Sequence, residues 1–344
     1  MLKASKSLSV LALCAAVLVG LPQAHAANCV TQAQMTPADR SALSGAARAM
    51  MVQVQNGDIS GLRGATLPAV AADFSGIQAS AENLQPLVQK ATVTVDAIYD
   101  LDASTDQAAS TGTQFFCGSP VVVLSFQNLP PGHYALALMH ATGVEKPQQV
   151  ALILALSPDK RWQLAGFFAK PMVEAGHDGL WYWVSARKYA QQNGKWGAYF
   201  YYRLAAGLLQ PLDNLSSPNL QKLQQESDSA KPDNLPSDKP VALSANGATF
   251  QLTAVDTTTQ FGGLDLDVHY TPDATQAAQL RDPPSARKQV VDVMSALLAQ
   301  HPELHNAFHG IWVHADQGDA TLFALELPIE QIASTGAPAP PATH

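Results

Sequence analysis

The sequence predicts an α+β protein: N-terminal helices on a curved antiparallel sheet, an aromatic helical hairpin, and a small C-terminal β-β-α-β-β domain. Three observations lead to this class. Apolar residues recur at helical spacing over 37–55, six runs of strand length follow over 92–168, and helical spacing returns over 179–226. Helices followed by consecutive strands favour an antiparallel sheet over alternating parallel units.

The first helix has a clear beginning and end, because Thr36-Pro37 provides a cap with proline at the first helical position and Asn56-Gly57 stops it. The expected strands are Thr92–Leu101, Thr113–Gly118, Val121–Gln127, His133–Thr142, Gln148–Leu156 and Arg161–Phe168.

Residues 1–26 have the form of a secretory signal peptide. Lys3 and Lys6 give a positive start, Leu8–Leu21 is apolar, and Ala24-His-Ala26 matches a small-x-small cleavage site. The apolar run is shorter than the ~20 residues that a membrane span needs. We therefore expect export, with a periplasmic or extracellular location after cleavage near Ala26 and no transmembrane span in the mature chain.

Removal of 26 residues from 344 leaves 318, and the loss of two lysines takes the formal charge from −8 to −10. This length suggests about two domains. The acidic balance argues against nucleic acid or an anionic membrane as partner. A protein or small-molecule ligand remains as the expected partner, and the sequence leaves the oligomeric state open.

Two cysteines follow the cleavage site, and an even pair in an exported chain predicts a Cys29–Cys117 disulfide. Closing a loop of this length contributes on the order of 4 kcal/mol in the chain-entropy model. A catalytic thiol is disfavoured because no histidine follows at a recognisable spacing. A lipid anchor at Cys14 is disfavoured because Leu13 stands where a small residue is normal.

The chain divides at its polar, proline-rich segments. We expect a first α+β domain over 27–175, a helical hairpin over 176–226 packed on it, and a linker over 227–243. A small α+β domain over 244–332 and a disordered tail over 333–344 complete the chain.

A resemblance to a known superfamily rests on the order of helices and strands and on the closing strand Asp159-Lys-Arg-Trp-Gln-Leu-Ala-Gly-Phe167. Over Pro37–Lys170, less than half of the chain, this pattern resembles the nuclear transport factor 2-like superfamily, whose members often end in a similar strand. The resemblance implies a cone-like sheet with an apolar mouth. In enzymes of the superfamily, Asp, His or Tyr side chains point into that mouth.

No catalytic motif of the superfamily is present, so no catalytic residue is carried over, and Tyr99, Tyr134 and His140 are the residues to inspect. His140 shares a strand face with Tyr134 by alternation. A buried imidazole there could act as a base, although a core or rim histidine is the commoner case. Asp96 and Asp100 are expected on the face opposite Tyr99.

The hairpin consists of Gly179–Gln192 and Lys195–Leu209, joined by Asn193-Gly194. Nine of the 24 aromatic residues lie between Trp181 and Tyr202, which predicts packing against the sheet. The alternative is an exposed face that binds a ligand or partner. The residues of that face would be Trp181, Tyr182, Tyr199 and Tyr201.

One pattern in the C-terminal domain could hold a metal, because Asp265, Asp267 and His269 alternate along one strand face and several histidines, His314 among them, follow near the next strand. A half-solvated strand shows the same alternation, so we expect no metal and no other cofactor. Asp265, Asp267, His269 and His314 are the candidates if one binds.

The sequence has no nucleophile elbow, phosphate loop, HExxH or dinucleotide motif. We expect a non-catalytic binding or interaction protein of the cell envelope. The alternatives are an isomerase- or hydrolase-like enzyme that uses an apolar cone pocket, and a purely structural envelope protein. An open or a filled cone interior would separate these classes.

Overall fold

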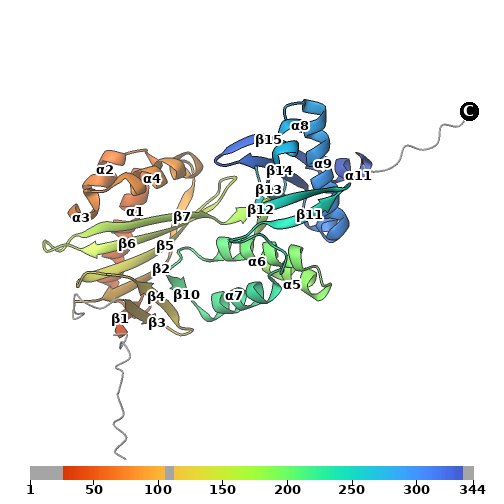
Figure 1. Ribbon diagram of the computed structural model, residues 1–344. Helices are drawn as coiled ribbons and strands as arrows, with labels where there is room; N and C mark the ends of the chain where they lie inside the picture. The colour runs from red at the N-terminus through yellow and green to blue at the C-terminus, as the bar shows by residue number, and fades with distance from the viewer. Residues whose placement is uncertain (1–25, 105–111, 336–344) are drawn as a thin grey trace, which may run out of the picture.

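The computed structural model describes residues 26–104 and 112–335, which form two large sheets joined by a helical region (Figure 1). The α+β class is confirmed. The predicted signal peptide, except for Ala26, lies outside the described residues, as does the predicted tail beyond Thr335. Residues 333–335 of that tail belong to the last helix instead. Within the described ranges, no helix combines the length and apolarity needed to cross a membrane.

The N-terminal sheet has eight strands in the order β10-β4-β3-β1-β2-β5-β6-β7. All neighbours are antiparallel except β1 and β3, which are parallel. The strands are β1 (Ala26–Thr31), β2 (Thr92–Asp102), β3 (Thr113–Cys117), β4 (Val122–Phe126), β5 (His133–Thr142), β6 (Gln148–Leu156), β7 (Trp162–Pro171) and β10 (Leu215–Ser216). The disulfide between Cys29 and Cys117 is confirmed and joins β1 to β3, with the Cα atoms 5.3 Å apart.

Four helices cover one face of this sheet (Figure 1). They are α1 (Pro37–Gln55), α2 (Ile59–Gly64), α3 (Pro68–Ala71) and α4 (Ser75–Val88). Thr36 caps α1 by accepting a hydrogen bond from the Asp39 amide, and the buried side of α1 carries the residues at the predicted helical spacing. These side chains meet Ala137, Met139 and Leu152 of the sheet in one core.

The opposite face of the sheet carries a second core, in which Tyr134 and Leu136 of β5 pack with Ile153 of β6. Leu212 and Leu215, from the segment that follows the hairpin, close this core. The N-terminal sheet is therefore covered on both faces.

The hairpin comprises α5 (Gly179–Gln191) and α6 (Lys195–Leu209), and α7 (Pro218–Ala230) packs beside α6. The short strands β8 (Val173–Glu174) and β9 (His177–Asp178) pair with each other just before it.

The buried rings of the hairpin share a core with the C-terminal sheet, which differs from the predicted packing on the N-terminal domain. Hydrogen bonds add to this apolar packing: the buried Tyr201 hydroxyl donates to the Ala307 carbonyl at 2.6 Å, and the hydroxyl of the half-buried Tyr189 donates to the Asn306 carbonyl at 2.7 Å. Buried tyrosines need such partners, and the C-terminal segment near residue 307 supplies them.

The C-terminal sheet has the order β11-β12-β13-β14-β15. Its strands are β11 (Val241–Ala245), β12 (Ala248–Thr258), β13 (Asp265–Thr271), β14 (Gly310–Gln317) and β15 (Ala320–Pro328). Its helices are α8 (Ala274–Gln279), α9 (Pro283–Gln300), α10 (Leu304–Ala307) and α11 (Ile329–Thr335). The helical crossover makes β13 and β14 parallel.

Two boundaries differ from the prediction. The expected linker 227–243 shrinks at both ends, because α7 continues to Ala230 and β11 begins at Val241. The domain is therefore β-β-β-α-β-β rather than β-β-α-β-β. Leu266, Val268 and Tyr270 of β13 enter the core, where the Tyr270 hydroxyl donates to Gln289 of α9 at 2.7 Å. The alternate residues of β13 lie on the opposite face.

Candidate functional site

A cleft of about 380 Å³ lies between the N-terminal sheet and the helical region. Strands β2, β5 and β6 form one wall, α5 and α6 form the second, and the segment from Pro211 to the first turn of α7 closes the cleft. Its principal lining residues are Asp96, Tyr99, Leu138, His140, Gln149, Val150, Leu180, Trp183, Leu209, Pro211, Leu215 and Leu220. Most of these side chains are apolar, as is usual for small-molecule sites.

The main polar feature of the cleft is the pair formed by His140 and Asp96, with His140 Nδ1 2.9 Å from Asp96 Oδ2. Asp96 was expected on the strand face opposite Tyr99, and this prediction is wrong. A β-bulge between Val95 and Ala97 interrupts the alternation of β2. Asp96 therefore lines the same cleft as Tyr99 and His140.

The other expected residues of this domain fall into two environments. Tyr99 lines the cleft, and burial raises the pKa of its phenol. Tyr134 lies in the core below a loop, where its hydroxyl donates to the Pro130 carbonyl at 2.8 Å. Asp100 pairs with His133 instead of facing the cleft residues. Of the three residues selected from the sequence, Tyr99 and His140 thus come together and Tyr134 does not join them.

Gln149 is a cleft residue that the sequence analysis did not single out. Its side-chain amide is buried and donates to the Leu208 carbonyl at 2.7 Å and to the Pro171 carbonyl at 3.3 Å. These bonds tie β6 to the end of α6 and hold the two walls together. The only signal in the sequence was the pair of glutamines, Gln148 and Gln149, at the start of an otherwise apolar strand.

The aromatic residues proposed as a binding face separate into buried and exposed members. Tyr182 and Tyr201 are buried, and burial raises the pKa of both phenols, that of Tyr182 to about 12. The predicted binding role does not hold for these two, because their rings have almost no exposed surface. Tyr199 is half-buried beside Arg203. Trp181 is exposed and its ring stacks on that of His177 at 3.5 Å.

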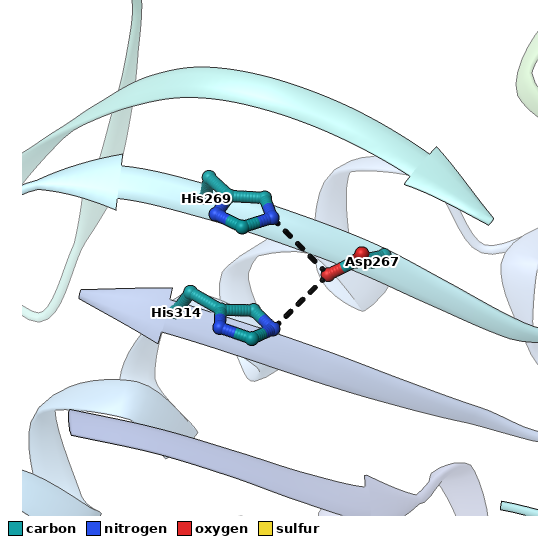
Figure 2. Close-up of side chains that lie close together, drawn as sticks. All are labelled: Asp267, His269 and His314. Carbon is teal, nitrogen blue, oxygen red and sulfur yellow. Dashed lines mark ion pairs between the residues drawn. The ribbon is translucent and has the colours of Figure 1, made fainter. Parts of the chain in front are cut away.

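A second group of polar residues lies on the face of the C-terminal sheet opposite α9. Figure 2 shows Asp267 and His269 of β13 and His314 of β14 pointing toward one another. Asp267 Oδ1 lies 3.4 Å from His269 Nε2 and 3.2 Å from His314 Nε2. The parallel register sets His269 directly opposite His314, so the two rings stack with centroids 4.4 Å apart.

Two further residues support this group. His269 Nδ1 lies 2.6 Å from Asp316 Oδ2, and the Thr321 hydroxyl donates to Asp316 Oδ1 at 2.6 Å. Burial acts to raise the pKa of Asp316, but the bonds from Thr321 and His269 outweigh it and lower that pKa. Burial, together with the nearby His269, lowers the pKa of His314.

Asp265, the fourth metal candidate, belongs to a different group. It is fully buried, its Oδ1 lies 2.9 Å from His309 Nδ1, and Glu326 faces the same space. Burial, followed by the charge of Asp265, raises the pKa of Glu326. Gly310 leaves room for both carboxyl groups, since a Cβ there would lie 2.5 Å from Glu326 Oε1 and 2.7 Å from Asp265 Oδ1.

Comparison of the chain with protein-family models, curated proteins and solved structures finds no match in any of the three.

Proposed function

We propose that the protein is an exported, non-catalytic binding protein that holds a small, mainly apolar molecule in the cleft between the N-terminal sheet and the hairpin. The cleft itself carries this proposal. Its volume of about 380 Å³ falls within the roughly 300–1,000 Å³ typical of small-molecule sites. The disulfide between Cys29 and Cys117 supports the exported location.

The His140–Asp96 pair favours a ligand with one polar group. Apolar side chains from both walls would cover the body of the ligand, and the pair would exchange hydrogen bonds with a hydroxyl at one end. The His140 side chain is 41% exposed, so water reaches the imidazole. This hydrated position suits recognition better than proton abstraction by a desolvated base.

The second candidate is an isomerase- or hydrolase-like enzyme that uses the same cleft. One observation favours it: Asp96 contacts His140 in the manner of a carboxylate that orients a catalytic imidazole, and Tyr99 lines the same space. The nuclear transport factor 2-like resemblance is consistent with both candidates.

The test uses an uncharged apolar fluorescent dye, N-phenyl-1-naphthylamine, with long-chain alcohols and alkanes as competitors. Leu180→Arg places a charge at the mouth of the cleft on an exposed position of α5, where Leu180 is 59% exposed. Val184→Arg is the matched control, because Val184 lies one turn further along α5, is 51% exposed and is not a cleft residue.

We expect Leu180→Arg to weaken dye binding by about tenfold or more, since a charge facing an apolar site loses hydration, and Val184→Arg to leave it unchanged. His140→Gln should remove the preference for alcohols over alkanes while dye affinity stays within about threefold. Equal weakening by both arginine variants, or no binding by the wild type, would refute the proposal. Chemical conversion of a bound alcohol or ester would favour the enzyme.

A further inference from the structure

We propose that Asp267, His269 and His314 form a binding site for a divalent transition metal ion of the zinc class on the C-terminal sheet (Figure 2). The site lies on β13 and β14, and none of its residues lines the cleft. It does not depend on the function proposed above.

The spacing of the ligand atoms matches a tetrahedral ion. Nitrogen and oxygen ligands about 2.0–2.1 Å from zinc lie ~3.3 Å from one another at the corners of a tetrahedron. Asp267 Oδ1 is 3.4 Å from His269 Nε2 and 3.2 Å from His314 Nε2. The distances from the Asp267 oxygen to the two histidine nitrogens therefore already match the ligand–ligand distances around a tetrahedral zinc ion.

Two of the three atoms that would bind the ion have no hydrogen-bond partner. Asp267 Oδ1 and His314 Nε2 are both buried and unpaired in this sense, and His314 as a whole is only 7% exposed. A buried polar atom without a partner costs about 1–3 kcal/mol. Two such atoms facing each other are explained if both donate electron pairs to one cation.

The residues behind His269 hold it in the form that binds a metal. Its Nδ1 is 2.6 Å from Asp316 Oδ2, and Thr321 donates to the other oxygen of Asp316. A proton on Nδ1 leaves the lone pair on Nε2, which is the atom nearest Asp267. This chain of carboxylate, imidazole and ion is the usual support of a histidine ligand.

Binding requires one local adjustment. The stacked rings of His269 and His314 are inclined by only 12°, and an ion in the plane of both rings needs them to tilt toward each other. Rotation about the bond that joins each ring to its Cβ supplies this tilt. The three protein ligands leave one corner of the tetrahedron for water or an exogenous ligand.

The experiment uses the mature full-length protein, stripped with a chelator and titrated with Zn²⁺ or Co²⁺ alone. Metal content after gel filtration and the visible absorption of tetrahedral Co²⁺ are the readouts. The variants are His269→Gln, His314→Gln and Asp316→Asn, with His309→Gln to test the neighbouring group. His133→Gln is the matched control, because His133 is also paired with an aspartate but on the other sheet.

We expect about one equivalent of metal in the wild type and in His133→Gln. His269→Gln and His314→Gln should each weaken binding by about 100-fold or more, since each loses a ligand. Asp316→Asn should weaken binding by about 10- to 100-fold, as is typical for a residue that supports a ligand. These results would establish the site.

A second measurement needs no ligand variant and covers the case in which the variant at buried His314 does not fold. The ring of Trp312 lies 4.0 Å from that of His314, so Co²⁺ in the site should quench its fluorescence. This quenching should be missing in Trp312→Phe.

Three results would overturn the proposal: no metal bound by the wild type, unchanged binding in a folded His269→Gln variant, or loss of metal in His309→Gln but not in His269→Gln. The last result would place the ion at Asp265, His309 and Glu326, the neighbouring group of potential ligands.

Discussion

Gly179 at the start of α5 packs closely against the end of α6, and its replacement by alanine should destabilise the protein by about 1–3 kcal/mol. A Cβ at Gly179 would lie 2.6 Å from Leu209 Cγ and 3.1 Å from Leu208 Cβ. Both contacts involve atoms close to the α6 backbone, so the two helices must separate to relieve them. Leu209 also lines the cleft, and the same substitution should weaken dye binding there.

Gly207 provides a control of opposite sign. It lies in α6 and is exposed, and a Cβ at this position would meet no atom within 4 Å. Alanine is more stable than glycine in a helix by roughly 0.5–1 kcal/mol, so Gly207→Ala should stabilise the protein slightly.

The measurement is urea denaturation followed by tryptophan fluorescence. Trp181, Trp183 and Trp196 lie in the hairpin, so the signal reports on the helices that the substitutions change. The two alanine variants should differ in unfolding free energy by about 1.5–4 kcal/mol. Equal stability of Gly179→Ala and Gly207→Ala would show that the close approach of α5 and α6 is absent.

Three further perturbations test the interactions that hold the domains together. Tyr201→Phe should cost about 1–3 kcal/mol in urea denaturation, because the buried Ala307 carbonyl loses its donor; an unchanged midpoint would contradict this contact. Replacing both Cys29 and Cys117 by serine should cost about 2–5 kcal/mol, and reduction of the wild type should give a similar loss; insensitivity of the wild type to reductant would contradict it. Burial acts to raise the pKa of Glu226, but the hydrogen bonds that it accepts from Arg187 and Trp183 of α5 outweigh this effect and lower that pKa. The stabilisation is therefore complete above about pH 4.3, the ordinary pKa of glutamate, and is lost as the pH falls through the lower folded-state value. Glu226→Gln should flatten this part of the stability profile, and an unchanged acid dependence would refute the assignment.

The parts of the fold that the sequence predicted depend on local patterns. The first helix follows from a cap and an uninterrupted apolar period, and α1 (Pro37–Gln55) ends at the predicted Asn56. Strands β5 and β6 have the predicted bounds because apolar side chains fill both faces between clear turns. The disulfide followed from the even number of cysteines after the predicted cleavage site.

The missed features depend on register and on long-range packing. Strand β11 was hidden in a proline-rich segment, although Asn246-Gly247, with φ of 47° and 81°, is a hairpin signal that the sequence displays. The bulge that turns Asp96 into the cleft has no sequence signal. Asp316 of β14 contacts His269 of the neighbouring strand β13, and no local pattern in the sequence shows that pairing.

The position of β1 has a consequence for how the N-terminal sheet is assembled. This strand is the earliest described segment, yet it lies between β3 and β2 in the interior of the sheet. Without it, the eight-stranded sheet would separate into a three-stranded piece, β10-β4-β3, and a four-stranded piece, β2-β5-β6-β7. Residues 26–31 thus join the two parts of the sheet. This strand can pair with β3 only after the chain has been synthesised as far as Cys117.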